Sequence, residues 1–418
     1  MATETPKKIL VTIFNRAHYG RLRSVLKAIQ NHPKLELQVM AAVPAAHGNF
    51  LTNWVHSKPH TKSVSWRWYL RAFLLSWTNP RALQQSDFLL KHILQDGFPV
   101  NSSIPMFLDG GMPETMAKSV GLGMFRIVDE LKRLKPDVVF VNADRFEMMA
   151  VTLAAAYLNI PIAHNEGGDV SGSIDESIRH AITKFAHLHF TATETSKKRV
   201  IQMGEDPKFV FNVGSPVIDT LKTLDLRSAP AVSGIDFQKP YLVVLVHPVA
   251  TDTGENNHNL VKKIIQVVGD LNMQTIFLGS NNDAQSDKIG SVLRNWNKSG
   301  SGKPKNVLVT KHLPPDDFYR VLAGAACLIG NSSSFIREGA FLGTPAVIVG
   351  SRQQNRDCGQ NVKEVPADEQ KIKQTVLEQI KRGRYPSDPI FGGGKSGQRI
   401  AELLVSVRPN LQKQFKEL

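Results

Sequence analysis

Short apolar runs alternate with longer amphipathic stretches along most of the 418-residue chain. Runs such as 136–141 and 241–247 have the length and composition of buried strands, and stretches such as 259–271 repeat apolar residues at helical spacing. Strands that alternate with helices are typical of α/β layers around parallel sheets. The pattern predicts strands at 9–13, 35–42, 136–141, 160–164, 209–213, 241–247, 274–279, 307–310, 327–330 and 346–349, and helices at 19–29, 121–134, 146–158, 259–271, 316–325, 335–342, 368–382 and 396–407.

The alternation breaks near residues 214–225, and residues 228–239 are rich in small and polar side chains. We therefore expect two doubly wound, Rossmann-like α/β domains facing a cleft. Ligands of such sheets bind beyond the carboxyl ends of the strands, so the cleft is the expected site. The expected boundaries are 1–215 for the first domain, 216–395 for the second, and 396–418 for a last helix with the first domain as its candidate packing partner.

A segment at about residues 54–91 stands apart as an insertion in the first domain. It holds four of the five tryptophans, and its charged residues are mostly Lys and Arg. Residues 66–77 fit a basic amphipathic helix suited to a membrane interface. The favoured alternative is a helix packed on its own domain or on a second subunit.

Composition narrows the functional classes. The net charge of +14 suggests a polyanion, but Lys and Arg are spread along the chain, so no nucleic-acid partner is expected. No apolar run is long enough to span a bilayer, and residues 1–8 lack the apolar centre of a secretory signal. Two cysteines exclude a disulfide framework. These features predict a soluble, cytoplasmic protein, with peripheral membrane contact a less favoured option.

The strongest motif in the second half is Gly330-Asn331-Ser332-Ser333-Ser334-Phe335-Ile336-Arg337-Glu338. A strand ends, hydroxyls follow and a helix begins, so free N–H groups and the helix dipole can hold phosphate oxygens. Glu338, one turn later, suits the two hydroxyls of a ribose. A serine before a helix is also the usual N-cap, which is the structural alternative.

Acidic residues follow the predicted strands of the first half. Asp144, Glu166 and Asp175 lie in neighbouring strand-to-helix loops, and they would converge at one face of the sheet. Convergent carboxylates can tune one another's pKa and move a proton to or from carbon. The alternative for Asp144 and Asp175 is helix capping. From the second half, His247 and the loop arginine Arg352 would face the same cleft.

These segments resemble the hydrolysing UDP-N-acetylglucosamine 2-epimerases. The likeness is carried by 144–147 (DRFE), 164–184 (HNEGGDVSGSIDESIRHAITK), 247–249 (HPV) and 330–362, with a looser match at 15–20. The resemblance implies the glycosyltransferase-B architecture, no cofactor and no metal, a UDP-sugar substrate, and a homodimer or homotetramer. It also implies removal of the C2 proton with loss of UDP, then addition of water to a glycal, in sialic acid-like or surface polysaccharide synthesis.

By the same resemblance, Asp144, Glu166, Asp175 and His247 are the catalytic candidates. The substrate-binding candidates are Arg16, Asn281, His312, Ser332, Ser333, Glu338 and Arg352.

Four departures from the family pattern bear on the substrate. His18 stands where an acid is usual, Ala143 replaces a glycine, and Asn165 replaces an apolar residue. Phe335 replaces a glycine at the nucleotide site, where we expect its bulk to crowd or reshape the pocket. Two other interpretations stay open: a glycosyltransferase-B transferase, and a nucleotide-sugar-binding protein without turnover.

Overall fold

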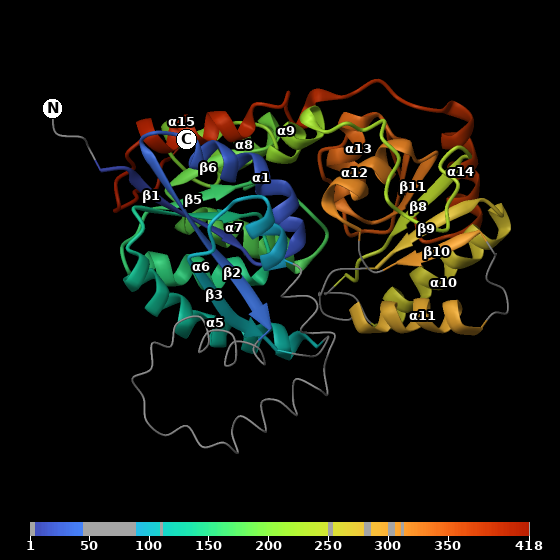
Figure 1. Ribbon diagram of the computed structural model, residues 1–418, viewed down its shortest axis with the longest axis horizontal. Helices are drawn as coiled ribbons and strands as arrows, with labels where there is room; N and C mark the ends of the chain where they lie inside the picture. The colour runs from blue at the N-terminus through green and yellow to red at the C-terminus, as the bar shows by residue number, and fades with distance from the viewer. Residues whose placement is uncertain are drawn as a thin grey trace, which may run out of the picture.

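A computed structural model describes residues 5–44, 89–108, 112–249, 254–279, 286–299, 306–310 and 313–417. Two parallel sheets, each wrapped by helices, lie beside one another (Figure 1). The tryptophan-rich segment, apart from 89–91, lies outside the described residues. Among those residues, no helix has both the length and the apolar content needed to cross a bilayer.

The first sheet has seven strands in the order β3-β2-β1-β4-β5-β6-β7, and every pairing is parallel. The strands are β1 (Lys7–Ile13), β2 (Leu35–Pro44), β3 (Ser102–Phe107), β4 (Val138–Asn142), β5 (Ile162–Asn165), β6 (Leu188–Thr191) and β7 (Val210–Asn212). The helices are α1 (Arg16–Gln30), α5 (Pro113–Leu134), α6 (Phe146–Tyr157), α7 (Ile174–Phe185), α8 (Glu194–Gln202) and α9 (Pro216–Thr223), with a 3-10 turn η1 (Pro207–Phe209).

The second sheet has six parallel strands in the order β10-β9-β8-β11-β12-β13. They are β8 (Tyr241–Leu245), β9 (Gln274–Leu278), β10 (Val307–Thr310), β11 (Cys327–Gly330), β12 (Ala346–Val349) and β13 (Val362–Val365). The helices around it are α10 (Gly254–Leu271), α11 (Ser286–Ser299), α12 (Pro315–Gly324), α13 (Ser333–Leu342) and α14 (Glu369–Arg382), with a 3-10 turn η2 (Pro389–Phe391); a last helix, α15 (Ser396–Ser406), follows in the chain.

Both sheets reverse strand order beside their first strand, which creates a crevice at the carboxyl ends of β1 and β4 and of β8 and β11. This arrangement confirms the predicted fold, two Rossmann-like domains of the glycosyltransferase-B type. It also explains why central strands such as β4 and β8 are continuously apolar and buried, since helices cover both faces of each sheet. Along β1, Ile9, Val11 and Ile13 pack into one cluster and Leu10 packs into the opposite one.

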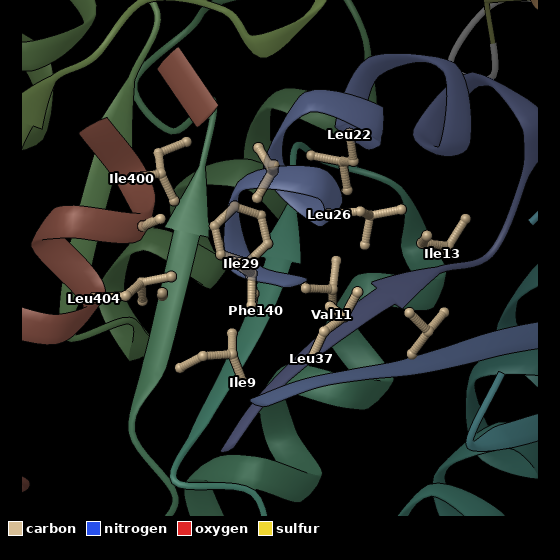
Figure 2. Packing of buried hydrophobic residues seen from close by; sticks show 14 of the residues in the cluster. Ile9, Val11, Ile13, Leu22, Leu26, Ile29, Leu37, Phe140, Ile400 and Leu404 are labelled. Atoms are coloured by element: carbon tan, nitrogen blue, oxygen red, sulfur yellow. The ribbon is translucent and has the colours of Figure 1, made fainter. Parts of the chain in front are cut away.

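The last helix returns to the first sheet. After the second sheet is complete, the chain crosses back and α15 packs along α1 (Figure 1). Figure 2 shows Ile400 and Leu404 of α15 in the same core as Ile29 and Phe140. Lys7 Nζ donates to the carbonyl of Leu404 at 2.8 Å, so the two ends of the chain stabilise one another.

Most predicted elements are confirmed, with ends shifted by a few residues. The region 214–225, interpreted as a break in the pattern, instead contains the helix α9, which begins at Pro216. Pro is well suited to the first turn of a helix, where its missing N–H is not needed. The linker 228–239 has no regular element, as predicted.

Candidate functional site

An open cavity of about 1450 Å³, counted to include its mouth, lies between the two sheets. Its walls come from the carboxyl ends of β4 and β5 and the start of α1 on one side. The ends of β8 and β11, the start of α13 and the loop after β12 form the other side. The candidate residues that border it are Arg16, Asp144, Glu166, Asp175, His247, Ser332, Ser333, Glu338 and Arg352. Asn281 and His312 lie outside the described residues.

The start of α13 forms one end of the cavity. Ser332 is the N-cap, and its side chain accepts from the Ser334 amide at 3.3 Å. The Ser333 hydroxyl instead accepts from two guanidinium groups, Arg21 at 3.4 Å and Arg337 at 3.3 Å. The end therefore combines a helix dipole with two cations, which suits a phosphate group.

Arginines dominate the cavity wall. Seven arginines and five carboxylates line it, so the described lining carries a net charge of 7 − 5 = +2. Burial lowers the pKa of Arg16 to about 10 and that of Arg21 to about 10. Burying these cations close together is unfavourable in free energy, so the cavity favours a ligand with several negative charges.

Glu166 is enclosed where the two domains meet, and only 1% of it is exposed. Its Oε1 accepts from the Ser215 hydroxyl at 2.8 Å, and its Oε2 accepts from Arg337 at 2.7 Å. Arg21 Nη1 lies 3.5 Å from the same Oε2. Burial alone would raise the pKa of Glu166, but the charges of Arg337 and Arg21 outweigh it and hold the pKa at about 2.

Asp144 follows β4 and forms an ion pair with Arg179 of α7. Arg179 is 1% exposed and also donates to the Asp169 carbonyl at 2.7 Å. Burial, with the neighbouring arginines, lowers the pKa of Arg179 well below its ordinary value. Asp144 retains some solvent exposure and faces the cavity, so it can reach a bound ligand.

Asp175 and His247 approach from opposite domains. Asp175 lies in the first turn of α7, where its Oδ2 accepts from the Ser173 hydroxyl at 3.1 Å. The backbone of His247 is fixed by Asn331, whose side chain accepts from the His247 amide at 2.7 Å and donates to its carbonyl at 2.8 Å. Asn331 thereby links the end of β11 to the end of β8 and holds the backbone of His247 at the cavity wall.

Glu338 lies one turn into α13 and is 2% exposed. Its Oε2 accepts no hydrogen bond from any residue that the structure describes, and the nearest recorded cation is Arg337 Nε at 3.9 Å. Burial raises its pKa against the opposing charges of Arg337 and Arg21. A carboxylate oxygen left in this state is suited to accept hydroxyl donors of a ligand.

The loop after β12 forms part of the cavity wall and contacts both domains. Arg352 Nη1 and Gln353 Nε2 donate to the Asn331 carbonyl at 3.1 and 3.0 Å. Arg356 forms an ion pair with Asp169 at 2.5 Å, and the Gly172 amide donates to the Arg352 carbonyl at 3.0 Å. A Cβ at Gly172 would come 2.1 Å from the Ser351 carbonyl oxygen, so the backbones of the two domains touch here.

The departures from the family pattern have distinct surroundings. Ala143 adopts a φ of 60°, a conformation that favours glycine. His18 is buried at the cavity wall, and burial followed by Arg145 and Arg21 lowers its pKa well below its ordinary value. Asn165 donates to the Asn142 side chain at 2.7 Å. The expectation that Phe335 crowds the nucleotide pocket is wrong: it is fully buried in the core beneath α13 and does not line the cavity, because that position of the helix faces the sheet.

Sequence reasoning missed three residues that organise the site: Arg21, Asp169 and Arg337. Arg21 and Arg337 occupy the interiors of helices, where arginines are usually solvated. Arg337 offered one signal, because it precedes Glu338 on a short helix that begins at the serine motif. Among the described residues, no three His, Cys, Asp or Glu side chains gather in a way that would hold a metal ion.

A protein-family model described as UDP-N-acetylglucosamine 2-epimerase matches residues 84–405. Over 407 residues the chain is 29% identical to the UDP-N,N'-diacetylbacillosamine 2-epimerase (hydrolyzing) of Legionella pneumophila, covering 96% of both chains. It is 28% identical to the UDP-N-acetylglucosamine 2-epimerase of Neisseria meningitidis, covering 95% of both.

Solved structures give the same fold. The UDP-GlcNAc 2-epimerase from Neisseria meningitidis bound to UDP-GlcNAc matches with a TM-score of 0.71 and 16% identity, over 96% of this chain and 100% of the other. The enzyme from Methanocaldococcus jannaschii in complex with UDP-GlcNAc and UDP matches with a TM-score of 0.71 and 19% identity, over 95% and 99%. At these identities the structural matches show the fold alone.

Proposed function

Because the chain belongs to the UDP-N-acetylglucosamine 2-epimerase family, we propose that it is a hydrolysing 2-epimerase that converts a UDP-N-acetylhexosamine to the free 2-epimeric sugar and UDP. UDP-N-acetylglucosamine, giving N-acetylmannosamine, is the reference substrate. A 2,4-diacetamido-trideoxy sugar is the second candidate, since one relative is named for UDP-N,N'-diacetylbacillosamine. The product would feed sialic acid-like or surface polysaccharide synthesis.

The observation that carries the proposal is the division of the cavity between the domains. The second domain supplies the start of α13 and Glu338, which suit a diphosphate and a ribose. The first domain supplies Asp144 and Asp175, which approach the cavity from neighbouring strand-to-helix regions. A nucleotide sugar laid across the cavity would put its anion on the arginines and its pyranose among the carboxylates.

In the proposed reaction, a carboxylate of the first domain accepts the proton from C2. The C–H electrons form the C1–C2 double bond as the C1–O bond breaks, and UDP leaves with the electron pair of the C1–O bond. Arg21, Arg337 and the α13 dipole stabilise the charge that develops on the leaving diphosphate. A second acid then gives a proton to the opposite face of C2, and water adds its oxygen to C1 and loses a proton to a carboxylate of the site. Asp144, Glu166, Asp175 and His247 are the candidates for these proton transfers.

The test is incubation of the full chain with UDP-N-acetylglucosamine in deuterated water. We expect UDP release together with deuterium at C2 of the free sugar. Release without deuterium would indicate plain hydrolysis or transfer, and UDP binding without release would indicate a binding protein. The same assay with the diacetamido-trideoxy substrate decides between the two sugars by kcat/KM.

Asp144→Asn is the matched variant, because it keeps the side-chain shape and removes the charge. We expect turnover to fall by at least about a hundredfold, with UDP affinity within a few-fold of the parent, as judged by calorimetry. Loss of the folded state, measured by circular dichroism, would instead make Asp144 structural. Assembly as a homodimer or homotetramer also remains a prediction, which light scattering of the intact chain would check.

A further inference from the structure

Two arginines are shared between Glu166 and the start of α13. Arg337 places Nη1 2.7 Å from Glu166 Oε2 and Nη2 3.3 Å from Ser333 Oγ. Arg21 does the same with Nη1 at 3.5 Å from Glu166 and Nη2 at 3.4 Å from Ser333. Each guanidinium therefore has one edge on the carboxylate and the other on the proposed phosphate site.

The two arginines come from different domains, Arg21 from α1 and Arg337 from α13. Glu166 and Arg337 are each 1% exposed, so their pairing is almost fully shielded from solvent. An anion arriving at Ser333 must use the same two cations that now neutralise Glu166. The carboxylate and the ligand thus compete for shared charge.

A proton acceptor works best when its pKa lies near the working pH. With its pKa held at about 2, Glu166 is a weak acceptor in the empty cavity. The charged and titratable groups that face it are His18 and Arg21 on α1, His164 on β5, Arg337 and Glu338 on α13, and Arg356 in the loop after β12. Among them, Arg337 lowers the pKa of Glu166 the most, and Arg21 comes next.

Building on the proposed function, we propose that Arg21 and Arg337 are shared counter-ions that hold Glu166 inactive in the empty cavity and transfer to the diphosphate of the nucleotide sugar, so that this carboxylate becomes a competent proton acceptor only with substrate bound. The diphosphate brings negative charge beside Glu166 and draws the guanidinium groups toward itself. Both effects favour the protonated carboxyl and raise its pKa. Water and stray ligands without a diphosphate leave the carboxylate neutralised.

The coupling is reciprocal, which makes it measurable with UDP alone. If the diphosphate weakens the hold on Glu166, then removing the charge of Glu166 strengthens the hold on the diphosphate. We expect Glu166→Gln to bind UDP about tenfold more tightly than the parent. Glu205→Gln is the matched control, because Glu205 is another buried, ion-paired carboxylate of the first domain and lies outside the cavity. Its UDP affinity should equal that of the parent.

The second readout is proton uptake, obtained by calorimetry of UDP binding in two buffers of different ionisation enthalpy. Since binding raises the pKa of Glu166, the parent should take up more protons per UDP than Glu166→Gln at about pH 5. The titration of UDP itself cancels in this difference. Equal uptake, or equal or weaker UDP binding by Glu166→Gln, overturns the proposal.

Arg21→Gln carries the same test if Glu166→Gln does not fold, because Arg21 is 16% exposed and tolerates change more easily. UDP should bind about tenfold more weakly, and the extra proton uptake should shrink, since one shared cation is gone. Unchanged uptake overturns the proposal. Failure of the parent to bind UDP overturns the proposed function as well, whereas UDP binding without the Glu166-dependent difference overturns only the shared counter-ions.

Discussion

Replacing Glu338 by Gln separates the stability of the chain from its capacity to bind a nucleotide. In the folded chain the Glu338 carboxylate is 2% exposed, and Oε2 accepts no hydrogen bond from the described residues. A buried polar atom without a partner costs about 1–3 kcal/mol. Gln has the same shape without the charge, so we expect the free energy of unfolding to rise by about 1 kcal/mol at neutral pH. For a domain of this size that corresponds to a rise of about 2–4 °C in Tm.

The pH dependence has a definite sign. Burial raises the pKa of Glu338 above its ordinary value of 4.5, so the native state binds more protons than the unfolded state in the range above 4.5. The contribution of Glu338 to the free energy of unfolding therefore falls as pH rises through this range. The advantage of Glu338→Gln should be small at about pH 4 and larger at about pH 7, as measured by chemical unfolding at both values.

Binding should change in the opposite direction. Hydrogen bonds from ribose hydroxyls to a carboxylate contribute about 1.5–3 kcal/mol, so UDP affinity should fall about 10- to 100-fold in Glu338→Gln. Pyrophosphate, which lacks the ribose, should bind as well as to the parent or better, because a negative charge near Arg337 is gone. A less stable variant, or one that binds UDP normally, would refute the assignment of Glu338 to the ribose.

Two further changes test how the chain holds its domains. Gly214→Ala should lower the free energy of unfolding by about 2 kcal/mol in urea titration, since φ is 82° and the Cβ would lie 2.9 Å from Gly392 Cα. Gly121→Ala is the control, because its Cβ would meet no atom within 4 Å, and it should stabilise α5 instead. Equal effects of the two variants would contradict the close approach of the backbones at Gly214 and Gly392. Lys413→Met should lower the free energy of unfolding by about 1–3 kcal/mol, because Lys413 Nζ pairs with the buried Glu205 at 2.6 Å. Hydrogen bonds and charges hold the pKa of Glu205 at about 2 despite burial, so the loss of stability should be complete at pH values above 4.5 and should shrink as pH falls toward 2. Replacement of the exposed Lys208 by Met is the control. A loss that does not depend on pH would exclude the ion pair as its cause.

Strong periodicity accounts for the elements that were predictable from sequence. Strands such as β1 and β8 are buried on both faces, so they read as continuous apolar runs. The edge strand β3 was missed because it is half-buried and contains Pro105, which argues against a strand in sequence. The helix α9 was missed because Pro216 at its start is, in sequence alone, more typical of a break between elements than of a helix.

The site also contains residues whose placement could be predicted from sequence and residues whose placement could not. Asp144 and Glu166 follow strands, and parallel strands bring their carboxyl ends together, so their convergence at the cavity could be foreseen. The pairing of Arg337 with Glu166 could not, because the two residues are 171 positions apart and belong to different sheets. Only the relative placement of the domains brings these charges into contact, and no local pattern encodes it.

Ala143 offers the last test, because its backbone conformation is costly for any residue with a Cβ. It adopts a φ of 60° between β4 and Asp144, and its amide donates to the Asn165 carbonyl at 2.9 Å. The left-handed conformation costs Ala about 1–2 kcal/mol. Ala143→Gly removes that cost but adds unfolded-state entropy of about 0.4–1 kcal/mol and loses a buried methyl group.

These opposing contributions leave Ala143→Gly within about 1 kcal/mol of the parent in unfolding free energy. Ala143→Val should lose more than about 2 kcal/mol, since a β-branched residue is a true outlier at this φ. Chemical unfolding of both variants measures the difference. A Val variant as stable as the parent would show that the backbone at this strand end relaxes freely, and Asp144 would then lack the fixed position that a proton transfer to or from C2 requires.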